Sequence, residues 1–133
     1  MVVTTLHDTV LTYLKADADM IASPCSTRIY VDNWLPDGYV KTNGPILVFA
    51  PRGGPGSTYY YMENITMVFR SFAVSISDAF AIDDALFIAL RKTNNPANAS
   101  VFYAKDIVSP ALSREPGGLY VVSSSFGVSE VIS

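Results

Sequence analysis

Residues 65–74 read ITMVFRSFAV and lead directly into residues 75–91, SISDAFAIDDALFIALR, and this junction decides the fold. The first segment is rich in β-branched and aromatic residues, which predicts a strand. In the second segment Ser75 or Ser77 can cap a helix, Asp78 lies in its first turn and Arg91 lies in its last. Its apolar stripe contains several alanines, which allow a close approach to a sheet. The junction therefore predicts a strand followed by a helix that packs on the sheet.

The predicted strand at residues 65–74 has two mixed faces. Residues 66, 68, 70, 72 and 74 share one face and residues 65, 67, 69, 71 and 73 share the other, and neither set is cleanly polar. Helices on one side of the sheet and a neighbouring subunit on the other would explain this pattern. Mixed faces also occur in ordinary sandwiches.

Before this junction, three-and-four spacing of apolar residues predicts an amphipathic helix over residues 6–18. A short β-rich run follows at 28–31, and residues 32–38 form a loop with a Pro-Asp-Gly turn. The uninterrupted apolar run at 46–50 predicts a central strand that is covered on both faces.

After residue 50, glycine and proline predict an exposed connection at residues 51–57, and Tyr59, Tyr60 and Tyr61 open another strand. Strands are expected at 100–105 and 119–131, with a loop between them that holds Pro110 and Arg114. The order predicts one α+β domain over residues 1–133, with two helices packed on one face of a mostly antiparallel sheet.

Composition favours a chain that associates. The 133 residues are 50% hydrophobic and 16% charged, against a usual charged share of about 25%. A small monomer rarely leaves large apolar patches in water, so we expect part of this surface to be buried against other subunits.

Charge and cysteine content argue against several classes of function. A net charge of −3 without a basic stripe disfavours tight binding of DNA or RNA. A single cysteine and a single histidine fall short of a disulfide or a structural zinc site, which fits a reducing compartment. The apolar runs are too short to span a membrane, and we interpret the sequons at Asn64 and Asn98 as chance matches.

No residue pattern predicts catalysis, a cofactor or a metal. We interpret His7 as a surface helix residue whose neighbour Asp8 points elsewhere, and Cys25 as structural. Asp83 and Asp84 are adjacent on a helix, hence about 100° apart, so they favour a solvated face over a facing carboxylate pair. The aspartates at 17 and 19 lack the further ligands of a calcium loop.

The glycine-rich segment that begins Arg52-Gly53-Gly54 invites comparison with a phosphate-binding loop. It lacks a Gly-Lys-Ser/Thr ending and a following helix, and Pro55 removes a backbone donor. We therefore interpret it as a hairpin arm that reaches a partner, and we interpret Tyr59, Tyr60 and Tyr61 as core or interface residues.

With its elements in place, the chain resembles the tail-terminator, or tail-completion, proteins of long-tailed bacteriophages. The resemblance covers most of the chain and lies in the order of the predicted elements and in the pattern of residues within them. It rests on the N-terminal helix, Thr27-Arg28-Ile29-Tyr30 before a loop with Pro36, Gly44-Pro45-Ile46-Leu47-Val48, the strand-to-helix junction, and Glu115-Pro116 before the last strand.

The resemblance implies a structural virion protein rather than an enzyme. It implies a ring, usually a homohexamer, that caps the tail tube, stops its polymerisation and joins the tail to the head. The partners would be the tail-tube protein and the head-completion protein, DNA would pass through the lumen without specific binding, and assembly would occur in the host cytoplasm. Subunit or tube contacts are expected from the segments of the chain that combine turn chemistry with aromatic side chains: Arg52, Gly53, Gly54, Tyr59, Tyr60, Tyr61 and Trp34.

Two other interpretations stay open. One is a head-completion or tail-tube protein of the same virion. The other, more distant, is a small enzyme or ligand-binding domain, which a deep polar pocket with perturbed carboxylates would favour.

Overall fold

A computed structural model describes residues 6–32, 34–51, 64–94, 102–114 and 117–130. Five strands form one sheet in the order β1-β2-β3-β5-β4. They are β1 (Ile29–Val31), β2 (Ile46–Pro51), β3 (Asn64–Ala73), β4 (Phe102–Arg114) and β5 (Tyr120–Glu130). Only β1 and β2 pair in parallel, so the predicted α+β class with a mostly antiparallel sheet is confirmed.

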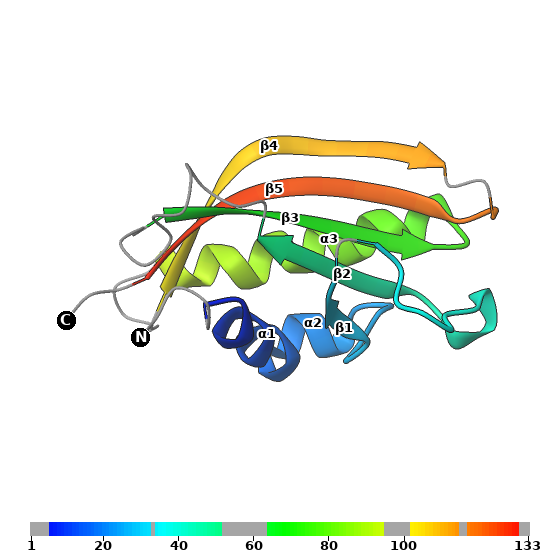
Figure 1. Ribbon diagram of the computed structural model, residues 1–133, viewed down its shortest axis with the longest axis horizontal. Coiled ribbons are helices and arrows are strands. Elements are labelled where there is room, and N and C mark those ends of the chain that lie inside the picture. Colours follow the sequence, from blue (N-terminus) through cyan, green and yellow to red (C-terminus); the bar gives the residue numbers. More distant parts are fainter. Residues whose placement is uncertain (1–5, 33, 52–63, 95–101, 115–116, 131–133) are drawn as a thin grey trace.

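Three α-helices, α1 (Leu6–Ala16), α2 (Ala18–Ala22) and α3 (Ile76–Arg91), cover one face of the sheet. In Figure 1, α3 runs along the sheet behind β2 and β3, while α1 and α2 lie below, next to β1. Two short 3-10 helices, η2 (Lys41–Asn43) and η4 (Lys92–Asn94), complete the described elements. The main core lies between helices and sheet and includes the stacked rings of Phe49 and Phe69, whose centroids are 5.0 Å apart.

The junction of β3 and α3 is confirmed. Ser75 caps α3 by accepting the backbone N–H of Asp78, and the helix ends at Arg91. The run at 46–50 is buried throughout and forms the interior strand β2, which is flanked by β1 and β3. The middle of the sheet is β3, because β5 and β4 continue the sheet on its far side.

The amphipathic helix expected over residues 6–18 is confirmed as α1, but it ends at Ala16, and a separate short helix, α2, follows it. Asp17 is extended (φ −73°, ψ 131°) and accepts the N–H groups of Asp19 and Met20, which starts α2. An aspartate offers the backbone this capping geometry as an alternative to a continuous helix.

The loop expected around Pro110 and Arg114 is also wrong, since both residues belong to the 13-residue strand β4. Register shifts occur between Asp106 and Val108 and again between Val108 and Ala111. Proline is tolerated here because β4 lies at the edge of the sheet and its pairing is irregular at this point. The strand expected at residues 59–61 lies outside the described residues.

Candidate interaction surface

The sheet face opposite the helices is covered only in part, and by a loop. Residues Ile46, Val48, Phe72, Leu119 and Val121 form a small buried cluster on this face. Leu35 and Tyr39, from the connection between β1 and β2, pack against it. No described helix covers this face, and Trp34 and Tyr30 are among its exposed side chains.

Trp34 is the largest of the exposed side chains on this face and is 44% exposed. Its ring meets the ring of Phe72 edge-on, with 5.1 Å between centroids and an interplanar angle of 84°. The Arg70 guanidinium lies 5.4 Å from the centre of the Trp34 ring, within the range of a cation–π contact. Two residues of β3 therefore hold the indole in place while almost half of it faces solvent.

Arg28, just before β1, is held rigidly beside this cluster. Its Nε donates to the carbonyl of Pro45 at 2.7 Å, and its Nη2 donates to the carbonyl of Pro24 at 2.8 Å. The guanidinium lies against Gly44, where an added Cβ would come within 3.0 Å of Nη2. Two carbonyls and one close backbone approach thus fix the orientation of this cation.

Tyr39 lies beside Gly44 and near Arg28. Its hydroxyl donates to the carbonyl of Gly44. Burial raises the pKa of the Tyr39 hydroxyl, and the nearby Arg28 charge opposes that rise in pKa only in part. The tyrosine therefore stays protonated and remains a hydrogen-bond donor.

An open cleft of about 210 Å³ lies between the strand β1 and this loop. Tyr30, which is 43% exposed, shares the loop-covered face with its register partner Val48. The cleft is lined by Arg28, Tyr30, Pro36, Asp37, Tyr39 and Asn43, among others. Its aromatic walls and fixed cation suit a side chain of a protein partner.

Tryptophan, tyrosine and arginine are the residue types that dominate the energetic centres of protein interfaces. Trp34, Tyr30, Arg28 and Arg70 meet this description, and we call them the helix-free surface. Of the residues predicted to make contacts, only Trp34 is described here. The other predicted contact residues, Arg52, Gly53, Gly54, Tyr59, Tyr60 and Tyr61, lie outside the described residues.

Sequence reasoning missed Arg28, Tyr30 and Arg70 because it assigned them only to strands. The alternation in β3 placed Arg70 and Phe72 on one face, but the proximity of Trp34 depends on how the loop folds back. The pairing of Arg28 with the carbonyl of Pro45 joins residues 17 positions apart and has no local signature.

The residues weighed for catalysis are not gathered into one site. Cys25 is buried, its Sγ lies 3.3 Å from Ser23 Oγ, and burial raises the pKa of its thiol, which suits the structural role expected for it. His7 Nε2 lies 3.5 Å from Asp8 Oδ1, so the expectation that Asp8 points elsewhere is wrong. Within the described residues, no three His, Cys, Asp or Glu side chains are grouped so as to hold a metal ion.

The solvated face expected for Asp83 is wrong, although Asp84 is exposed. Asp83 is 5% exposed and its Oδ1 accepts a hydrogen bond of 2.9 Å from Ser124 on β5. The two aspartates therefore do not form a facing pair. A signal for this was present, because Asp83 lies four residues after Ala79 and three before Leu86, on the apolar side of α3.

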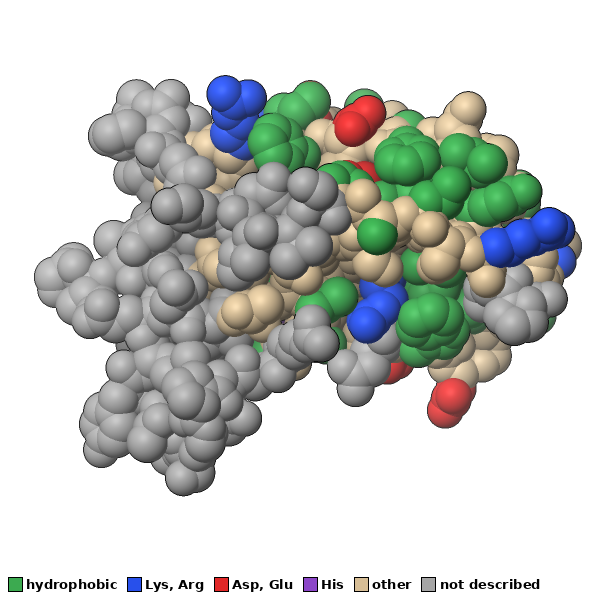
Figure 2. Space-filling model, turned by 90° about the horizontal axis from the view of Figure 1, so that it is seen from above, with side chains coloured by type: hydrophobic (Ala, Val, Ile, Leu, Met, Phe, Trp, Pro, Cys, Tyr) green, Lys and Arg blue, Asp and Glu red, His purple; other side chains and the backbone are tan. Residues whose placement is uncertain are grey.

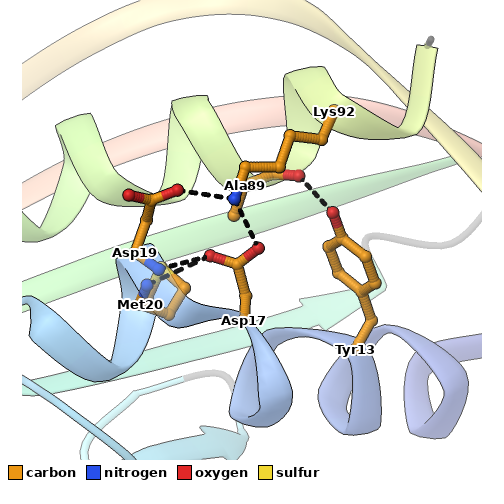
Figure 3. A network of polar contacts seen from close by, with 6 residues as sticks. All are labelled: Tyr13, Asp17, Asp19, Met20, Ala89 and Lys92. Carbon is orange, nitrogen blue, oxygen red and sulfur yellow. Dashed lines mark hydrogen bonds and ion pairs between the residues drawn. The ribbon is translucent and has the colours of Figure 1, made fainter. Parts of the chain in front are cut away.

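Asp17 and Asp19 join two parts of the helical layer (Figure 3). Lys92 Nζ lies 3.0 Å from Asp17 Oδ2 and also pairs with Asp19. Tyr13 adds a hydrogen bond of 2.6 Å from its hydroxyl to the carbonyl of Ala89. The hydrogen bonds that Lys92 donates to the carboxylates of Asp19 and Asp17 raise the pKa of Lys92 to about 12. We call these four side chains the helix clamp, and they hold α1 and α2 against the end of α3.

Along the described ranges, none of the helices combines the length and apolar character that a membrane span requires. No protein-family model matches the chain, and no curated protein matches it.

Proposed function

We propose that this chain is a structural subunit of a phage virion, a tail terminator that forms a ring at the end of the tail tube. The ring, a homohexamer, stops polymerisation of the tail and joins the tail to the head. Its partners are the tail-tube protein below and the head-completion protein above, and DNA passes through its lumen. The chain acts through surface contacts and not through catalysis.

The observation that carries the proposal is the helix-free surface. The described helices cover one face of the sheet, and Trp34 and Tyr30 are exposed on the other face, beside two arginines. In a closed ring every subunit uses two different surfaces, one toward each neighbour, and partners above and below need still more. A rigid aromatic and cationic surface supplies one of these contacts.

The charge of the chain supports the same proposal. With nine basic and 12 acidic residues, the subunit carries a net charge of −3. Like charge discourages contacts to phosphates, which suits a lumen that DNA crosses without being held.

The size of the cleft favours a protein partner over a small ligand. Sites for small molecules usually enclose about 300–1,000 Å³. The cleft beside Arg28 has about 210 Å³ and is open, so it fits one side chain of a neighbouring protein. A head-completion or tail-tube protein would also bind its partners through such a surface. The form of the assembled particle distinguishes those two proteins from a terminator.

The test is the native mass of the purified protein by light scattering, with electron micrographs of the same peak. A discrete ring of about six subunits that caps purified tail tubes is the expected result. Long cylinders would transfer the chain to the tail-tube class. A monomer that does not bind tube ends would contradict the proposal.

A pair of matched variants connects this test to the helix-free surface. Trp34→Ala removes the indole and should weaken the ring while the circular dichroism spectrum of the folded subunit is kept. Ile21→Ala removes a similarly exposed apolar side chain from α2, on the helical layer, and should leave ring formation unchanged. Equal effects of both variants would show that Trp34 has no special place in the contact.

A further inference from the structure

The helix α3 carries exposed apolar side chains on its outer side as well as buried ones toward the sheet. Its buried side consists of Ala79, Ile82, Asp83, Ala85, Leu86, Ala89 and Leu90. On the outer side Ile76 is 44% exposed and Ile88 is 49% exposed, and Phe87 is 38% exposed although its ring also lies 6.5 Å from that of Phe126 on β5. Figure 2 shows that hydrophobic side chains reach the surface in groups, with Lys/Arg and Asp/Glu side chains between them. A helix at the surface of a monomer normally carries polar residues on this side.

Two opposite charges lie along the same outer side of α3. Asp84 and Arg91 are exposed and seven residues apart, which is nearly two turns or about 10 Å along the axis. Neither forms an ion pair with another described residue. The Arg91 guanidinium lies 5.9 Å from the centre of the Phe87 ring, so it extends along the helix surface over an aromatic ring.

We propose that the outer side of α3 binds the same helix of a second copy of this chain, in antiparallel orientation. A two-fold axis between Phe87 and Ile88 brings Asp84 of each copy opposite Arg91 of the other. The exposed side chains of Phe87 and Ile88 then meet their counterparts at the centre, and the two ion pairs lie on either side of them. Residues three and four apart on a helix share a face, so all four groups reach the partner together.

The second copy is favoured over a different protein because the surface is complementary to itself. One acidic and one basic group lie at equal distances from the centre of an apolar patch, with Asp84 three residues before Phe87 and Arg91 three residues after Ile88. Reversing the direction of such a helix exchanges the two charges, which is what an isologous interface requires. Ion pairs at the border of the patch set the register and exclude the parallel arrangement.

This inference does not rest on the proposed function. Pairing through α3 uses the helical layer, whereas the proposed ring contact uses the opposite face of the sheet. A protein that pairs through α3 without capping tail tubes would keep this inference and lose the proposed function. A ring that caps tubes but does not pair through α3 would do the reverse.

Charge reversal at the two positions tests the pairing by analytical ultracentrifugation over a range of concentrations. Asp84→Arg and Arg91→Asp, each alone, place like charges opposite each other twice in the homodimer, and each should weaken self-association at least tenfold. An equimolar mixture of the two variants should restore association, because one copy then carries arginine at both positions and the other carries aspartate at both. Lys15→Glu, a charge reversal on the exposed surface of α1, is the matched control and should leave association unchanged.

Weakened association of each single variant together with restored association in the mixture would establish the antiparallel pairing, because a parallel pair would already place like charges opposite each other in the wild type. If the wild-type protein forms rings, the same pairing is measured as a doubling of the ring mass that the single variants lose. Failure of the mixture to associate, or a wild-type protein whose association ignores both reversals, would overturn the inference. In either of those cases a different partner or surface covers the outer side of α3.

Discussion

Ser124 on β5 donates a hydrogen bond of 2.9 Å to Asp83 on α3, and both side chains are buried between the helix and the sheet. The bond joins residues 41 positions apart and places a carboxylate among the alanines and leucines of the buried side of the helix. A buried carboxylate is retained only where donors satisfy it, so this contact positions α3 over β5.

Ser124→Ala should lower the free energy of unfolding by about 1.5–3 kcal/mol, because it deprives a buried acidic group of a donor. Urea unfolding followed by tryptophan fluorescence measures the change. Ser123→Ala is the matched control, since the neighbouring serine lies on the opposite face of the sheet and is only partly buried. An equal loss in both variants would show that the bond to Asp83 contributes nothing.

Asp17 has two separable roles in the helix clamp. Asp17→Ala removes the cap of α2 and the partner of Lys92, and should cost about 2 kcal/mol in total. Asp17→Asn keeps an amide oxygen at the cap and loses only the charge, so it should cost about 1 kcal/mol less. Thermal unfolding of both variants resolves the two contributions, and equal losses would mean that the cap is unimportant.

The clamp also predicts a loss of stability in alkaline solution. The pKa of Lys92 is raised in the folded protein from 10.5 to about 12. The unfolded chain therefore loses this proton first, so the stabilisation is complete below pH 10.5 and disappears as the pH rises to about 12. Because Lys92 is 37% exposed, solvent screening limits the effect to less than about 1 kcal/mol.

The measurement compares a protein that keeps Lys92 with its Lys92→Met variant at several pH values up to 12. Burial raises the pKa of the Tyr13 hydroxyl as well, so both proteins should carry Tyr13→Phe as a common background. The difference in unfolding free energy should shrink as the pH rises above 10.5. A constant difference would contradict the role assigned to the ion pairs.

Gly44→Ala should be more destabilising than Gly38→Ala. Both glycines have positive φ, +96° at Gly44 and +81° at Gly38, so each alanine incurs backbone strain of about 1–2 kcal/mol. Only at Gly44 does the new Cβ also meet the Arg28 guanidinium, at 3.0 Å, whereas nothing lies within 4 Å at Gly38. Equal losses in chemical unfolding would show that Arg28 moves aside freely.

Ser71→Ala should stabilise the protein by up to about 1 kcal/mol. Ser71 is fully buried in β3, and among the described residues its hydroxyl has no hydrogen-bond partner. Removing an unsatisfied buried hydroxyl removes its desolvation cost. The same substitution at Ser124 is expected to have the opposite sign, so the two variants together test the assignment of partners. A lower melting temperature for Ser71→Ala would indicate a partner beyond the described residues.

The amino-acid sequence alone determined the class of fold and the principal junction of β3 and α3. Runs of β-branched residues and a helical period of apolar residues are properties of short stretches of sequence. They can therefore be read without knowledge of the tertiary structure. The helix side that contains Ala79 and Leu86 was equally readable, and Asp83 lies on it. The charge of Asp83 nevertheless predicts a solvated position, and it is buried because a distant donor, Ser124, reaches it.

Only the tertiary structure decided where the chain departs from its local signals. Asp17 caps α2 through local hydrogen bonds, but its pairing with Lys92, 75 residues away, exists only in the folded structure. Pro110 is accepted in β4 because that strand lies at the edge of the sheet. Trp34 belongs to a surface because the loop folds over β3 and brings it to Arg70 and Phe72. Such contacts form only when elements far apart in the chain pack together. Local sequence patterns do not specify which distant residues will meet.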